Sequence, residues 1–212
     1  MQFKHLWLVL FALAVRFQTF IPLNKIEIVS LELGLLVPYF FVNRMQLRKL
    51  LLKFDSIKTD CFIGTIVGVL YCCCEYGWDR LTGAESQSIY LNSILLLPVA
   101  LAIVGWASAL YEELLFRSAV LSYCERRLGN PAIAIAVQGI LFGLAHWKRY
   151  FHEGMWYHAL STTAFGLALG LLAWKRRSFI PGWVAHALSN TYGVIFIPPA
   201  LVLGKAIGSW LH

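Results

Sequence analysis

Long apolar segments recur along the whole chain, and they limit the fold more than any other feature of the sequence. Hydrophobic residues make up 59% of the 212 residues and charged residues only 14%, and the mean hydropathy is +0.67. A helix that crosses a bilayer needs roughly 20 apolar residues, so about eight helices would use roughly 160 residues. The composition excludes a disordered chain and a disulfide scaffold. It predicts one all-α, polytopic membrane domain over residues 1–212.

Polar or helix-breaking residues separate the apolar segments. Gly129, Asn130 and Pro131 are typical of a helix stop followed by a new start. In the second segment we expect Glu27 and Glu32 to face other helices rather than lipid, because charged groups are costly against lipid. The predicted spans are about 6–21, 26–43, 60–77, 89–123, 131–147, 157–174, 181–197 and 199–211.

Basic residues give the predicted orientation of these spans. The formal net charge is +7, which in a soluble protein would suggest nucleic acid as a partner. In a membrane protein Lys and Arg gather in cytoplasmic loops. With the N-terminus inside, twelve Lys and Arg lie inside and four outside. We therefore expect an integral membrane protein with both termini in the cytoplasm, the lipid bilayer as its surroundings and no nucleic-acid partner.

The first cluster of ionisable residues lies deep in the fourth predicted span, where such residues are costly and are typical of functional sites. Glu113 and Arg117 are four residues apart, so they share a helix face and can pair. Glu112 is rotated by about 100° from Glu113 and is free to act as a general base. A purely structural ion pair would explain Glu113 and Arg117 but not Glu112.

A second candidate, His146, follows Phe142 by four residues. Glu112 lies 17 residues before Gly129, and His146 lies 17 residues after it. If the two helices form an antiparallel hairpin that turns at Gly129, both residues are roughly 25 Å from the turn. A carboxylate and an imidazole at one depth can share a water molecule.

A third pair lies in the seventh predicted span. His186 and Asn190 are four residues apart on one helix face. Both can donate hydrogen bonds to an oxyanion that forms when water attacks a peptide carbonyl. His186 is nine residues from Arg177, so it lies roughly 13 Å from that inner loop. The site is expected in the cytoplasmic half of the membrane.

These three clusters, EExxxR, FxxxH and HxxxN, resemble in their order the CPBP intramembrane proteases. That family includes CAAX prenyl endopeptidases of the Ras-converting type and bacterial Abi-like proteins, and the resemblance covers residues 90–195 as a catalytic core. It implies a helical fold and peptide-bond hydrolysis. Glu112 and His146 would activate water, supported by Glu113 and Arg117. His186 and Asn190 would form the oxyanion site.

The resemblance also bears on cofactor, substrate and location. It implies glutamic catalysis without a metal. Zinc held by His146, His186 and Glu112 is the alternative, although no HExxH motif is present. The substrate would be a membrane-anchored protein or peptide: a CAAX-type tail, a leader peptide or a C-terminal sorting tail. The short chain with short loops favours a bacterial plasma membrane. The sequence does not indicate the oligomeric state.

Two other functions stay open at this point. The chain could be a non-catalytic membrane scaffold or immunity protein that keeps the family fold. It could also be a proton-coupled transporter that uses the acidic pair as a relay, although no inverted repeat supports this.

Overall fold

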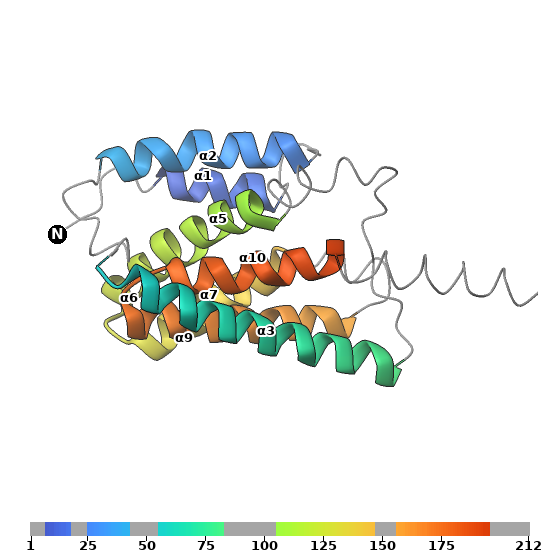
Figure 1. Ribbon diagram of the computed structural model, residues 1–212. Coiled ribbons are helices and arrows are strands. Elements are labelled where there is room, and N and C mark those ends of the chain that lie inside the picture. Colours follow the sequence, from blue (N-terminus) through green and yellow to red (C-terminus); the bar gives the residue numbers. More distant parts are fainter. Residues whose placement is uncertain (1–6, 18–24, 43–54, 83–104, 147–155, 196–212) are drawn as a thin grey trace, which may run out of the picture. The chain divides into compact units, whose positions relative to one another are not determined.

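In the computed structural model, helices form within each of the first seven predicted spans, as far as the structure describes them (Figure 1). The structure describes residues 7–17, 25–42, 55–82, 105–146 and 156–195. Within these residues all regular structure is helical, which confirms the predicted all-α class. The eighth predicted span, 199–211, lies outside the described residues. The helices are α1 (Trp7–Arg16), α2 (Lys25–Val42), α3 (Ile57–Thr82), α5 (Ser108–Glu113), the π-helix η4 (Leu114–Leu121), α6 (Ser122–Leu128), α7 (Pro131–Leu144), α9 (Trp156–Arg176) and α10 (Ile180–Ile195).

The fourth predicted span, 89–123, is described from residue 105 onward, and there the chain is not one continuous α-helix. Residues 89–104 of the prediction lie outside the described residues. Between α5 and α6 the chain winds as the π-helix η4 for eight residues. A π-helix uses hydrogen bonds from residue i to i+5 and is frequent at functional sites. Sequence periodicity does not distinguish it from an α-helix. The segment begins directly after Glu113 and contains Arg117, so the predicted motif lies at the junction.

The predicted turn between the fourth and fifth spans is confirmed. Gly129 ends α6 with a positive φ of 66°, a conformation that glycine adopts without strain. The side chain of Asn130 accepts hydrogen bonds from the backbone nitrogens of Ala132 and Ile133 and so caps α7. Pro131 occupies the first turn of α7, where its missing N–H costs nothing.

The chain divides into two compact units. The first comprises Met1–Cys61 and Tyr111–Gly182, and the second Phe62–Leu110 and Trp183–His212. In the first unit α1, α2, η4 and α7 share an apolar core, which includes Leu8, Ala12, Leu36, Phe116 and Phe142. This core places the start of η4 against α1 and α7.

Helices α7 and α9 of the first unit pack along each other through small residues. A Cβ atom on Gly143 would lie 3.2 Å from the Cα of Thr163, and one on Gly166 would lie 3.2 Å from the carbonyl oxygen of Gly139. Such close approach through glycine is typical of helices that pack within membranes.

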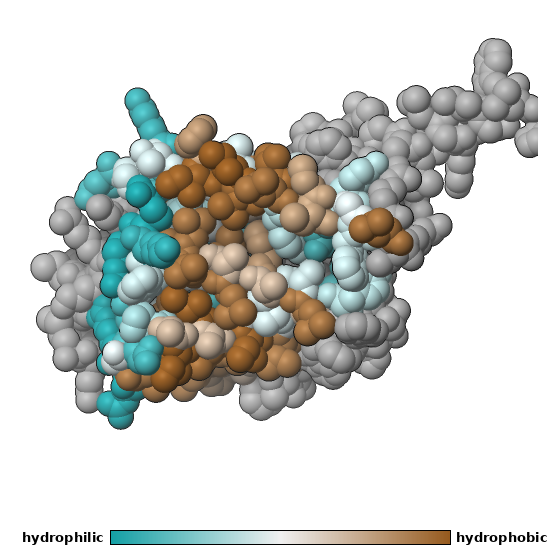
Figure 2. Space-filling model, turned by 90° about the horizontal axis from the view of Figure 1, so that it is seen from below, coloured by the Kyte–Doolittle hydropathy of each residue, from teal (hydrophilic) through white to brown (hydrophobic). Residues whose placement is uncertain are grey.

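Apolar side chains also cover much of the face shown in Figure 2, with hydrophilic ones gathered along one edge. On α3, Phe62, Ile66, Val69 and Leu70 are exposed. Among the described helices, Ile57–Trp78 within α3 is the segment long and apolar enough to cross a membrane. Eight crossings therefore stay a prediction.

Candidate active site

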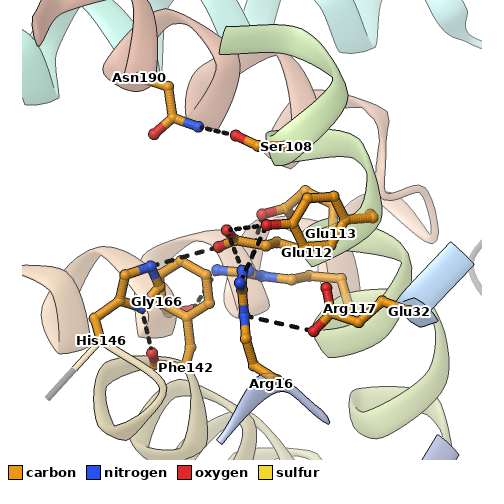
Figure 3. Close-up of polar contacts among 11 residues, drawn as sticks. Arg16, Glu32, Ser108, Glu112, Glu113, Arg117, Phe142, His146, Gly166 and Asn190 are labelled. Atoms are coloured by element: carbon orange, nitrogen blue, oxygen red, sulfur yellow. Dashed lines mark hydrogen bonds and ion pairs between the residues drawn. The ribbon is translucent and has the colours of Figure 1, made fainter. Parts of the chain in front are cut away.

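Glu112 and His146 face each other within the first unit, as the hairpin count predicts (Figure 3). Glu112 lies near the end of α5, and His146 lies just after α7. Glu112 Oε2 is 3.5 Å from His146 Nε2. The side chain of Glu112 is 7% exposed and that of His146 21%. A buried carboxylate and a partly accessible imidazole thus share one small region.

A hydrogen bond on the far side of the ring fixes the orientation of His146. Its Nδ1 is 2.8 Å from the carbonyl oxygen of Phe142, one helical turn earlier. A carbonyl only accepts, so Nδ1 carries the proton. In the neutral ring Nε2 then presents a lone pair toward Glu112 Oε2. Two acceptors that face each other can both take hydrogens from one water molecule, which is the arrangement the sequence predicts.

The other oxygen of Glu112 is held by residues outside the predicted site. Arg16 Nη2 of α1 forms an ion pair with Glu112 Oε1. The hydroxyl of Tyr111 donates to the same oxygen at 3.3 Å and accepts from Arg16 Nη1 at 3.1 Å. The guanidinium group of Arg16 is also 3.7 Å from Glu32 Oε1 of α2. Glu32 is fully buried, as expected for a residue that faces other helices.

Glu113 and Arg117 form the predicted pair beside Glu112. Arg117 Nη1 lies 2.8 Å from Glu113 Oε1, and both side chains have no exposed surface. Arg117 Nη2 donates to the carbonyl oxygen of Gly166 at 3.4 Å, and the guanidinium lies 4.3 Å from the centre of the Phe142 ring. Arg117 therefore contacts the residue whose carbonyl orients His146. A Cβ atom on Gly182 would lie 2.6 Å from Glu113 Oε2, so α10 begins close to this pair.

His186 and Asn190 belong to the second unit, and both lie on α10. His186 is buried, with 4% of its surface exposed. Asn190 Nδ2 donates to Ser108 Oγ at 3.1 Å, and Ser108 is also buried (Figure 3). The structure confirms one helix for the HxxxN motif. Its place opposite Glu112 and His146 stays a prediction.

Within the described ranges, no group of three or more His, Cys, Asp or Glu side chains could hold a metal ion. Glutamic catalysis and zinc binding both stay predictions.

Several contact residues were not identified from the sequence. They are Arg16, Tyr111, Gly166 and Ser108. Arg16 carries a visible signal, because an arginine within an apolar run needs a partner. The sequence does not say which carboxylate it meets. Gly166 contacts Arg117 through its backbone carbonyl oxygen, and the sequence gives no signal for a contact made by the backbone.

Comparison with known proteins places the site within a family. Residues 94–192 match the family model described as Rce1-like, type II CAAX prenyl endopeptidase Rce1-like. This range lies within the predicted core, 90–195. Neither a curated protein nor a solved structure matches the chain. Members of the family are generally proteases and are associated with membranes. Residues 94–192, which contain the three motifs, thus match an Rce1-like CAAX endopeptidase domain, consistent with the CPBP resemblance.

Proposed function

We propose that this chain is an intramembrane endopeptidase in which Glu112 and His146 activate a water molecule. The observation that carries the proposal is the 3.5 Å approach of Glu112 Oε2 to His146 Nε2. The remaining oxygen of Glu112 and the remaining nitrogen of His146 already have partners. Two acceptors in fixed positions orient a water molecule and can take its proton as it reacts.

The reaction follows from this geometry. Glu112 takes a proton from the water as its oxygen attacks the carbonyl carbon of the scissile peptide bond. The C=O double bond becomes a single bond to an oxyanion. When the tetrahedral intermediate collapses, the C–N bond breaks and the proton passes from Glu112 to the leaving nitrogen. His146 accepts a hydrogen bond from the water and keeps it in line with the carbonyl.

The proposed oxyanion donors are His186 and Asn190. They lie four residues apart in α10, so they share a helix face. An amide nitrogen is a hydrogen-bond donor, and in the structure Asn190 Nδ2 donates to Ser108 Oγ. Gly182, one turn before His186, packs against Glu113.

The finer assignments belong to the same proposal. We take the protein to cross the membrane with about eight helices, both termini in the cytoplasm and the site toward the cytoplasmic half. A bacterial plasma membrane suits the short loops. The substrate would be a membrane-anchored protein or peptide, with a prenylated CAAX tail as the first class to test because the matched family carries that name. Catalysis would need no metal.

Cleavage by purified protein tests the proposal. Wild type and Glu112→Gln, treated with a chelator, are incubated in detergent with membrane-anchored peptides that include prenylated CAAX tails. Mass spectrometry then locates the cut. We expect cleavage by the wild type and a rate lower by about 10²–10⁴-fold in Glu112→Gln, the usual contribution of a general base.

The other outcomes separate the alternatives. Wild-type cleavage that the chelator abolishes and zinc restores would replace the glutamic mechanism with the zinc one. Cleavage at the wild-type rate by Glu112→Gln would overturn the assignment of the base. A cellular phenotype that survives substitution of both Glu112 and His146 would favour a scaffold.

A further inference from the structure

Arg16 lies in the first unit and contacts Glu112 of the proposed site, although the sequence did not identify it as a site residue. It is the last residue of α1, and its side chain is 10% exposed. It contacts two carboxylates, Glu112 Oε1 and Glu32 Oε1. Its guanidinium carbon also lies 5.0 Å from the centre of the Tyr111 ring. These contacts fix the guanidinium group from three helices, α1, α2 and α5.

Two of the contacts with Glu112 meet at the same carboxylate oxygen. Arg16 and Tyr111 both bind Oε1, whereas Oε2 faces His146 (Figure 3). A carboxylate held at one oxygen by two donors loses most of its freedom to rotate. Its second oxygen then keeps one direction, toward the imidazole.

The charges in this cluster support the same interpretation. Buried charges need partners, and Glu113 already has Arg117. Arg16 supplies a cation that pairs with Glu112. Glu32 shares that cation from the opposite side, at 3.7 Å. The positive charge is therefore held between a residue of the proposed site and a carboxylate of α2.

We propose that Arg16 is a positioning residue for the general base: it holds Glu112 so that Oε2 points at the water and His146. The inference rests on the proposed function and extends it beyond the family domain. The match to the family begins at residue 94, whereas Arg16 and Glu32 lie in the first two helices. The N-terminal helices thus complete the site rather than only covering it.

Kinetics of Arg16 variants test the role in cleavage. The variants are Arg16→Gln and Arg16→Lys, assayed with a lipidated peptide that the wild type cleaves. A displacement of about 1 Å can cost about 10²-fold in rate. We therefore expect kcat of Arg16→Gln to fall by about 10²-fold with little change in KM. Arg16→Lys, which keeps the charge but not the planar fork, should recover part of that loss.

The matched control is Arg176→Gln. Arg176 pairs with Asp60 at 2.8 Å and has no contact with Glu112. Its loss should leave kcat unchanged. Wild-type kcat in Arg16→Gln, or an equal loss of kcat in Arg176→Gln, would overturn the positioning role.

A stability comparison tests the contact without any substrate. Melting temperatures are measured for Arg16→Gln, Glu112→Gln and the double variant. Each single change leaves a buried charge with fewer partners, whereas the double change removes both charges. We expect the melting temperature of the double variant to fall by less than the sum of the falls in the two single variants. Additive shifts in melting temperature would show that the two side chains do not interact, and would overturn the pairing of Arg16 with Glu112. Wild-type protein that cleaves no peptide would count against the proposed function, and this comparison would still decide whether Arg16 holds Glu112.

Discussion

Two Glu–Arg ion pairs in the first unit have the same nitrogen–oxygen distance but differ in their exposure to solvent. Glu113 and Arg117 lie 2.8 Å apart with no exposed side-chain surface. Glu125 of α6 and Arg177, the residue after α9, also lie 2.8 Å apart, but their side chains are 20% and 51% exposed. Arg177 donates to both oxygens of Glu125, and Trp174 donates to Oε1.

The difference shows what each pair does for the protein. Water can replace either partner of an exposed pair, so such a pair contributes little to stability. Nothing replaces a partner of the buried pair, and its loss leaves an uncompensated charge. The buried pair therefore constrains the residues around Glu112 and His146. The exposed pair joins α6 to the residue that follows α9.

The largest effect on stability should come from Arg117→Gln. This change leaves Glu113 buried without its cation, which costs about 3–5 kcal/mol. Replacing both residues, as Glu113→Leu with Arg117→Met, removes both charges and should cost much less. Unfolding in mixed detergent micelles measures both variants. If Arg117→Gln lowered the free energy of unfolding by less than about 1 kcal/mol, the value for an exposed pair, the buried pair would contribute no more to stability than the exposed one.

Gly166→Ala should have an intermediate effect. The new Cβ would lie 2.9 Å from Phe142 Cδ1 and 3.2 Å from the carbonyl oxygen of Gly139. Overpacking of this kind costs about 1–3 kcal/mol. Cleavage should slow as well, because Phe142 supplies the carbonyl that orients His146.

Gly34→Ala is the matched control, since the added Cβ would meet no described atom within 4 Å apart from its chain neighbours and the backbone of its own helix. In a helix this change should stabilise the protein by roughly 0.5–1 kcal/mol. If the two alanine variants unfold alike, close packing of α7 on α9 does not support the site.

The smallest effect should come from Arg177→Gln. Removing one partner of the exposed pair should cost about 0–1 kcal/mol, and less at 1 M salt. Arg177 also has a positive φ of 53°, so Arg177→Gly regains part of the loss by removing backbone strain. Unfolding at low and high salt checks both variants. A loss as large as that of Arg117→Gln would show that exposure does not separate the pairs.

Local features of the fold could be predicted from the sequence. The turn at Gly129 and Asn130 follows from residues next to one another, and the Glu113–Arg117 pair follows from helical spacing. The approach of Glu112 to His146 follows because both residues are 17 positions from Gly129, at which the helical hairpin turns.

Contacts between helices distant in the sequence could not be predicted. Arg16 is 95 residues before Tyr111, and no local pattern relates α1 to α5. The π-helix η4 has the composition of an ordinary apolar helix. The Ser108 contact of Asn190 likewise joins residues 82 positions apart. These features depend on tertiary packing.

The most direct test of the central claim is a kinetic double-mutant cycle of Glu112 and His146. The wild type, Glu112→Gln, His146→Ala and the double variant are compared by their residual kcat in cleavage of one lipidated peptide. Residues that act as a unit on one water molecule give strongly non-additive losses. The account predicts that the double variant is no slower than the slower single variant. Losses that multiply, or a His146→Ala variant that cleaves at the wild-type rate, would contradict it.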